Sequence, residues 1–397
     1  MMRRIAFLWA LAAALWSVGA AQEPENLERA LAFYGARPRV ERPQAGWQRL
    51  PDGLPDLRAA TCGECHSAIY DEWLVSTHGQ AWTDRQLQSE MTKSGNRWLC
   101  NNCHTPLLNQ MELWAVELSD GDVEKPLYVE NPLFDSAFRD EGITCAACHV
   151  RDGAVEGPTG IQTEAHPTRK ADRFADEAIC LTCHQAVRSY SGKDFICIFE
   201  TGAEWRESPY GQADQPCQSC HMQPVTRPQA VGEAPRPGRR HYWPGAGIFK
   251  VEGLGPPVDQ LGAGLGVEVE ATNDELVVRL SNSAAGHLLP TGDPERFILV
   301  EVDFSDSRRR PVGETYRERI GQTWEWWPVA RKLTDNRLAP LEVRELRIPR
   351  PETAVGWALV ATSHRISAEA LEFHDLGDYP SSRVTHRRIG DFPTDRR

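Results

Sequence analysis

The chain has 397 residues, of which 25% are charged, and its formal net charge is −12 at pH 7. An acidic protein of this kind repels the phosphate backbone, so nucleic acid is not an expected partner. Mean hydropathy is −0.48 and no long apolar run occurs beyond the N-terminus, so we expect no membrane span after the first residues are removed.

Residues 1–21 have the pattern of an export signal. Arg3 and Arg4 precede an apolar stretch from Ile5 to Val18, which ends in small residues. This stretch is too short to remain as a bilayer-spanning anchor. We therefore expect cleavage near Ala20 or Ala21 and a soluble periplasmic protein. Residues 22–61 are rich in Pro, Arg and Glu with little periodicity, which predicts an extended N-terminal arm.

Residues 62–225 contain five copies of the pentapeptide Cys-x-x-Cys-His. Two thiols at this spacing reach the two vinyl groups of one porphyrin, and the following imidazole reaches its iron. A zinc site or a disulfide framework also uses paired cysteines, but neither explains the histidine that follows each pair. We therefore expect five c-type haems, with ten thioether cysteines and five proximal histidines. The motifs are Cys62, Cys65 and His66; Cys100, Cys103 and His104; Cys145, Cys148 and His149; Cys180, Cys183 and His184; and Cys217, Cys220 and His221.

The region that holds the motifs offers too little chain to build an apolar core around each porphyrin. The haems themselves are therefore expected to form the core of residues 62–225. Short helices are predicted at the motifs, with long loops and almost no sheet between them.

Seven histidines outside the motifs are candidates for the second axial position of each iron: His78, His166, His241, His287, His364, His374 and His386. His78 lies twelve residues beyond His66, in a segment, 67–77, that reads as helix. Twelve helical residues span about 18 Å, whereas two nitrogens bound to one metal lie about 4 Å apart. His78 is therefore expected to bind the iron of a neighbouring haem.

Four runs resemble multihaem cytochromes of the cytochrome c-554 type, which are related to the haem core of hydroxylamine oxidoreductase. They are Trp73–His78, Glu141–His149, Cys217–Met222 and Gly286–Gly292. The resemblance covers most of residues 62–365. It implies that His78, His166, His241 and His287 are distal iron ligands.

The sequence departs from that group in two ways. The cytochrome c-554 type carries four haems, whereas this chain has five motifs. The pentahaem nitrite reductases carry a Cys-x-x-Cys-Lys motif, which is absent here, and this absence argues against their mechanism. The ligand in the fifth distal position is left open. Candidate histidines are His364, His374 and His386, and candidate sulfur ligands are Met91, Met111 and Met222. An iron without a sixth ligand is the remaining alternative.

Downstream of the motifs the composition changes twice. Residues 226–264 read as a Pro/Gly-rich linker, and residues 265–365 as a β-sandwich-like domain. Its predicted strands are 267–271 and 276–280, which form a hairpin, followed by 297–304, 343–348 and 357–363. Residues 366–397 are expected to be a C-terminal tail. The fold class is therefore α+β, with a haem-packed domain followed by an antiparallel sandwich.

Three further features have structural interpretations. Cys197, the one cysteine of the sequence outside the five motifs, lies among apolar residues and is expected to be a buried, inert thiol. Trp324, Trp326 and Trp327 are expected to pack against the haem domain, with an exposed docking surface as the alternative. Residues 335–340 read as a connection between strands.

Two functions remain open from the sequence. The first is electron transfer between redox partners, such as a quinol-oxidising membrane complex and a terminal reductase. The second is catalysis on a small nitrogen oxide or a peroxide at one five-coordinate haem, to or from which the other haems transfer electrons. The surplus of candidate ligands and the absence of Cys-x-x-Cys-Lys favour the carrier.

Overall fold

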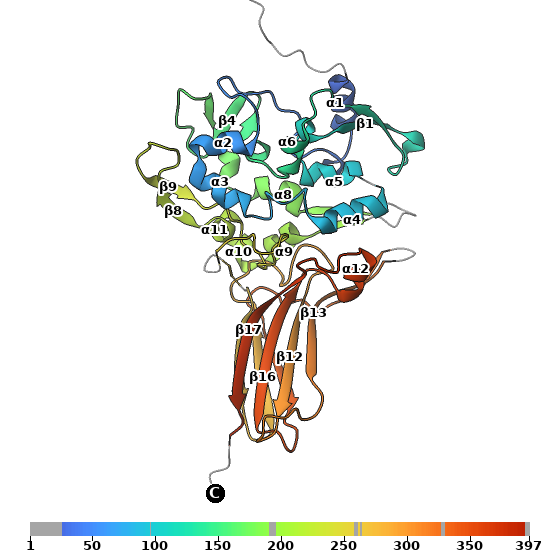
Figure 1. Ribbon diagram of the computed structural model, residues 1–397, viewed down its shortest axis with the longest axis vertical. Coiled ribbons are helices and arrows are strands. Elements are labelled where there is room, and N and C mark those ends of the chain that lie inside the picture. The colour runs from blue at the N-terminus through green and yellow to red at the C-terminus, as the bar shows by residue number, and fades with distance from the viewer. Residues whose placement is uncertain are drawn as a thin grey trace, which may run out of the picture.

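The computed structural model describes residues 26–95, 97–189, 196–257, 261–262, 264–326 and 330–393. The fold is mixed α+β (Figure 1). Short helices and small sheets make up residues 26–257, here called the helical region. Long strands dominate residues 264–393, here called the two-sheet region. The predicted export signal lies outside the described residues. No helix in the described ranges is long and apolar enough to cross a membrane.

The helices of the helical region are short, and the longest, α4, has 10 residues. Isolated helices of this length are marginal in water, so their stability depends on packing. They are α1 Leu27–Gly35, α2 Ala59–Cys65, α3 Ser67–Leu74, α4 Arg85–Ser94, α5 Arg97–His104, α6 Ser136–Asp140, α7 Cys145–His149, α8 Ala178–His184, α9 Thr201–Glu207, α10 Pro209–Gln212 and α11 Gln218–His221. Four 3-10 turns accompany them: η1 Arg39–Glu41, η2 Leu108–Gln110, η3 Ser119–Gly121 and η4 Asp172–Phe174.

The expectation of almost no sheet between the motifs was wrong. Three small sheets lie between the motifs and a fourth follows the last motif, because the chain in these stretches folds back and pairs its own backbone groups. They consist of β1 Leu113–Leu118 with β2 Pro126–Glu130; β3 Val150–Arg151, β4 Ala154–Gly157 and β5 Thr168–Lys170; β6 Ala186–Ser189 with β7 Ile196–Phe199; and β8 Pro224–Arg227 with β9 Arg236–Arg239.

The N-terminal arm is also not fully extended, because α1 forms within it. Leu27, Ala30 and Tyr34 are buried on one face of this helix and pack in a cluster with Trp98 and Trp114. This helix was not predicted, because the arm is mostly polar and only these three residues form its apolar face. The helical region therefore contains a conventional apolar core beside the motif-bearing helices.

The two-sheet region consists of a three-stranded and a five-stranded antiparallel sheet. Their orders are β10-β11-β15 and β14-β13-β12-β16-β17. The strands are β10 Gly266–Ala271, β11 Glu275–Ser281, β12 Phe297–Ser305, β13 Tyr316–Glu325, β14 Arg331–Asp335, β15 Val343–Pro349, β16 Gly356–His364 and β17 Ser382–Asp391. The predicted hairpin is confirmed as β10 and β11, which pair with Val269 opposite Val278. The other three predicted strands correspond to β12, β15 and β16.

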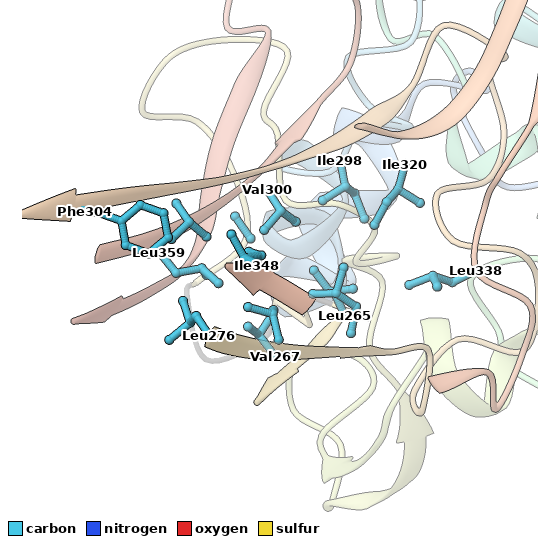
Figure 2. Close-up of a cluster of buried hydrophobic side chains, with 14 of the residues drawn as sticks. Leu265, Val267, Leu276, Ile298, Val300, Phe304, Ile320, Leu338, Ile348 and Leu359 are labelled. Atoms are coloured by element: carbon cyan, nitrogen blue, oxygen red, sulfur yellow. The ribbon is translucent and has the colours of Figure 1, made fainter. Parts of the chain in front are cut away.

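Apolar side chains from both sheets meet between them (Figure 2). Along β12, alternate residues face inward: Ile298, Val300, Val302 and Phe304 are all buried. Such alternation buries one face of each sheet in a shared core. The end of this core nearest the helical region carries the loop that contains His287.

Residues 366–397 are not merely a tail. They contain α12 Ala368–Phe373 and β17, which pairs with β16 from Gly356 opposite Asp391 to His364 opposite Ser382. β17 is an edge strand with few apolar residues, because one side of it faces solvent, and its sequence therefore lacks the alternation that predicts a strand. The two-sheet region thus extends to Asp391, beyond the expected boundary at residue 365.

Buried charged groups join the two regions. Asp84, at the start of α4, contacts Lys250 Nζ at 2.7 Å and accepts a hydrogen bond of 2.6 Å from the Tyr379 hydroxyl. Arg337 Nη1 lies 2.6 Å from Glu204 Oε1, and both side chains are buried. Charged groups removed from water need partners of this kind. The contacts therefore fix the position of the two-sheet region against the helices.

Candidate functional site

Each Cys-x-x-Cys-His motif lies on or against a short helix, as predicted. The motifs occupy α2, α5, α7, α8 and α11, in chain order. In a helix, residues i, i+3 and i+4 lie on one face. The two thiols and the histidine of each motif therefore project to the same side, where one flat ligand can meet all three.

The motifs lie close to one another although they are far apart in the sequence. The neighbouring Cys145 thiol lowers the pKa of the Cys62 thiol, so the first motif lies beside the third. In the same way Cys103 lowers the pKa of Cys183, which places the second motif beside the fourth. Cys180 lowers the pKa of Cys217, which places the fourth motif beside the fifth. All ten motif cysteines are free, so none of them supports a disulfide framework.

Backbone carbonyls orient four of the five motif histidines. Nδ1 of His66 lies 2.7 Å from Gln229 O, and the corresponding distances are 3.0 Å for His104 to Ala81 O, 2.8 Å for His149 to Glu156 O and 2.7 Å for His221 to Pro244 O. A ring whose Nδ1–H donates to a carbonyl keeps its lone pair on Nε2. Histidines that bind metals are held in this way.

Three motif histidines face a second histidine. The ring centroids are 6.2 Å apart for His184 and His78, 6.4 Å for His149 and His241, and 6.3 Å for His221 and His287. Two imidazoles on opposite sides of one metal, each with a metal–nitrogen bond of about 2 Å, place their centroids about 6 Å apart. The six side chains therefore fit an iron between each pair.

Burial lowers the pKa of all three second histidines. Burial, assisted by His184, lowers the pKa of His78 to about 3. Burial likewise lowers the pKa of His241 and of His287 to about 4. Nδ1 of His241 lies 3.0 Å from Arg239 O, and Nδ1 of His287 lies 2.9 Å from Leu288 O. All three rings are therefore neutral at pH 7, and in His241 and His287 Nε2 is left as the free acceptor, which is the form that binds a metal.

A buried turn presents His78. As predicted, α3 covers most of the segment that separates it from His66. The Ser76 hydroxyl donates to Trp73 O at 2.7 Å and accepts from Gly79 N at 3.3 Å, and the Trp73 and Ser76 side chains are buried. Ile143 N donates to His78 O at 3.1 Å. The runs 73–78 and 141–149 thus form one structural unit, which directs His78 away from its own motif to that of His184.

The other four candidate histidines do not face a motif histidine in the described part of the chain. His364 stacks on Phe297 with centroids 4.4 Å apart, and His386 lies on the edge strand β17. His374 follows α12 and contacts α4, where its Nδ1 lies 3.1 Å from Ser89 Oγ. His166 lies in the loop before β5, with Nδ1 3.3 Å from Thr168 Oγ1.

Consequently two motif histidines, His66 and His104, have no second histidine ring opposite them within the described ranges. Of the sulfur candidates, Met91 and Met111 are buried in apolar clusters, and Met91 packs near Cys100. Met222 directly follows α11.

The remaining sequence candidates are peripheral. The Cys197 backbone pairs with Arg188 in the β6–β7 hairpin, and its side chain lies outside what the structure describes. Trp324 and Trp326 stack with centroids 5.2 Å apart, and Trp326 is 39% exposed, so this pair is not in a core. Trp327 lies outside the described residues. Residues 335–340 do connect strands, from β14 to β15.

Sequence reasoning missed the buried charges around the second histidines. Burial alone would raise the pKa of Glu72, but hydrogen bonds from Arg227, His241 N–H and Arg240 lower it overall. Thr291, in the loop after His287, donates to Glu204 Oε2 at 2.5 Å. An acidic residue on an otherwise apolar helix face, such as Glu72 beside Trp73, is the one sequence signal that could have indicated such a site.

No family model and no curated protein matches the sequence. Among solved structures, the chain is similar to a penta-heme cytochrome c552 from Thermochromatium tepidum, with a TM-score of 0.61 and 15% sequence identity. The similarity covers 86% of this chain and 100% of that one. The protein therefore has the fold of a multihaem c-type cytochrome.

Proposed function

We propose that this protein is a periplasmic multihaem c-type cytochrome that carries five covalently bound haems and transfers electrons between redox partners. The observation that carries the proposal is the set of three histidine pairs, whose ring centroids are 6.2, 6.3 and 6.4 Å apart. Each pair combines a motif histidine with one from elsewhere in the chain. The fold shared with a penta-heme cytochrome and the five motifs support the same conclusion.

In this proposal the ten motif cysteines form the thioether bonds and the five motif histidines are the proximal ligands. His78 is the distal ligand of the iron bound by His184, His241 of that bound by His149, and His287 of that bound by His221. When bound, each haem supplies a one-electron iron couple whose potential the axial ligands and the surroundings set. With two histidines on the iron, no position is open to a substrate, which suits a carrier.

The arrangement of the motifs supports transfer through the molecule. Thiols of the first and third motifs, of the second and fourth, and of the fourth and fifth lie near enough to shift each other's pKa. Burial and the nearby Cys183 both raise the pKa of Cys148, which places the third motif beside the fourth. The motifs therefore form one continuous cluster, in which neighbouring haems would be close enough for electrons to pass between them.

The export signal expected at residues 1–21 supports a periplasmic location. The net charge of −12 favours basic partners or electrostatic steering between redox proteins. A quinol-oxidising membrane complex and a terminal reductase are the partners we propose. The narrower relationship to the cytochrome c-554 group is likewise proposed, on the four sequence runs that resemble it.

A second function is supported by a specific observation. Within the described ranges His66 and His104 have no facing histidine. An iron at either motif without a sixth ligand could bind nitric oxide, hydroxylamine or peroxide. The protein would then be a redox enzyme in which three fully ligated haems transfer electrons to or from the catalytic haem.

The spin state of the oxidised protein tests both functions. Replacing His78, His241 or His287 by alanine should each convert one low-spin haem to high-spin in the electron paramagnetic resonance spectrum, because each substitution removes one axial nitrogen. His386→Ala is the control and should change nothing. If the three variants keep the wild-type spectrum, the ligand assignment is wrong. A high-spin haem in the wild type that shifts when nitric oxide or hydroxylamine is added would favour the enzyme over the carrier.

A further inference from the structure

His241 lies in a segment without regular structure. It follows β9, which ends at Arg239, and is followed by Trp243, whose φ of 43° is in the left-handed region, and by Pro244. A segment of this kind has no ladder of backbone hydrogen bonds to hold it, and ordering it has a conformational entropy cost. Nevertheless the His241 ring lies 6.4 Å from that of His149. Something outside the segment must fix its position.

The structure shows one side chain that does so, Glu72 of α3. The backbone N–H of His241 donates to Glu72 Oε2 at 2.7 Å, and Arg240 Nη1 donates to Oε1 at 2.7 Å. Arg227 of β8 donates to both oxygens, at 2.6 and 2.9 Å. The carboxylate therefore accepts four hydrogen bonds, and its side chain is 3% exposed.

The position of His241 depends closely on the position of the Glu72 carboxylate. Charge-assisted hydrogen bonds in a buried site are strong and directional. The contact is made by the backbone N–H of the histidine itself, so a shift of the carboxylate moves the residue that carries the ring. Distances to a bound metal tolerate only about 0.2 Å of error. A small displacement of His241 therefore weakens its bond to iron.

We propose that Glu72 is a positioning residue, which holds His241 at the distance needed to bind the iron of the Cys145–His149 motif. The proposal rests on the function proposed above. It adds a residue on α3, the helix that follows the first motif, which controls the distal ligand of the third motif. Glu72 itself does not touch the iron.

The test compares Glu72→Gln with His241→Ala in the full, haem-loaded protein. Glutamine keeps the size of the side chain but places an amide N–H₂ against two guanidinium groups. We expect the affinity of His241 for the iron to fall about 10- to 100-fold, as for other substitutions of groups that orient a metal ligand. Carbon monoxide should then bind that reduced haem correspondingly faster than in the wild type. The same haem should become partly high-spin in Glu72→Gln, and added imidazole should restore its low-spin spectrum.

Asp84→Asn is the matched control. Asp84 is also a buried carboxylate with basic partners, Lys250 and Arg365, but it contacts none of the paired histidines. The control should bind carbon monoxide at this haem as the wild type does. Equal acceleration of carbon monoxide binding in both variants would overturn the proposal, because general destabilisation of the protein would then explain it.

Two further results would distinguish failure of this proposal from failure of the proposed function. If His241→Ala creates a high-spin haem and Glu72→Gln does not, the ligand assignment stands and the positioning role is wrong. If His241→Ala leaves the spectrum unchanged, His241 is not a ligand and both proposals fall.

Arg240→Gln keeps the idea testable should Glu72→Gln not fold. It removes one of the four hydrogen bonds at a side chain that is 33% exposed. A smaller acceleration at the same haem is expected, and no acceleration would contradict the proposal.

Discussion

At the scale of single residues, close backbone contacts determine where the second histidines lie. The His78 turn packs against Gly142, whose φ of 62° is left-handed. A Cβ at this position would lie 3.0 Å from His78 O, Ala81 N and Trp82 N. Only glycine combines this conformation with this close approach.

Gly142→Ala is therefore expected to destabilise the protein and to disturb one haem. The left-handed conformation alone costs an alanine about 1–2 kcal/mol, and the contacts at 3.0 Å push against the His78 backbone. We expect lower stability in chemical denaturation together with a fraction of high-spin iron, because His78 would move away from the iron that we propose it shares with His184.

Gly121→Ala separates the two effects. Gly121 has a φ of 72° but no heavy atom near its added Cβ. This variant should lose a similar amount of stability and keep a wild-type spectrum. High-spin iron in Gly121→Ala, or none in Gly142→Ala, would show that the close approach to His78 is unimportant.

The sequence predicted the residues that could bind haem better than those that hold them in place. The motifs are local patterns, and helix length alone showed that His78 must reach another motif. The partners of Glu72 could not be predicted, because Arg227 and Arg240 lie far along the chain and no local spacing joins them to α3. Only the fold brings these charges together.

At the scale of secondary-structure elements, the buried cluster at the start of α4 joins the helices to the two-sheet region. Asp84 contacts Lys250 at 2.7 Å and Arg365 at 3.6 Å, and all three side chains are largely buried. Removing one partner of a buried ion pair typically costs about 3–5 kcal/mol, because the remaining charge is left without compensation.

Asp84→Asn should therefore lower the free energy of unfolding by about 3 kcal/mol or more. Asp391→Asn is the control, since Asp391 pairs with Arg309 and both side chains are more than half exposed. Exposed pairs contribute about 0–1 kcal/mol. Equal losses in urea denaturation of the two variants would mean that the Asp84 cluster does not stabilise the contact between the regions.

The same cluster predicts a dependence on pH. Burial alone would raise the pKa of Asp84, but Lys250, Arg365 and the hydrogen bond from Tyr379 lower it below its usual value. A carboxyl group whose pKa is lowered on folding stabilises the protein fully above its unfolded pKa of about 4. This contribution is lost as the pH falls through the lower folded value. Below about pH 4 the wild type should lose stability more steeply than Asp84→Asn, and parallel curves would contradict this.

Elements with a clear apolar pattern were predictable, whereas those stabilised by their neighbours were not. The β10–β11 hairpin and strand β12 have inward-facing apolar residues that alternate or nearly so. β17 is formed because its backbone pairs with β16, and α1 because three residues dock on the Trp98 cluster. The β17 sequence lacks a clear alternation, whereas α1 does place Leu27, Ala30 and Tyr34 at helical spacing, within an arm of mostly polar composition.

At the scale of the whole molecule, the two regions act together if His287 is a ligand. His287 belongs to the two-sheet region, and its ring lies 6.3 Å from that of His221 in the helical region. The buried pair of Arg337 and Glu204 lies beside this loop, with Arg337 Nη1 donating to Pro290 O at 3.5 Å. The two-sheet region would then be part of the haem environment rather than an appendage.

The mass of the exported protein tests the central claim most directly. Every ligand assigned here depends on a haem bound covalently to each of the five cysteine pairs. Intact-mass spectrometry under denaturing conditions should show the chain without residues 1–20 or 1–21, plus five haem additions. A mass with no haem additions would contradict the account, since the facing histidines would then have no iron to bind.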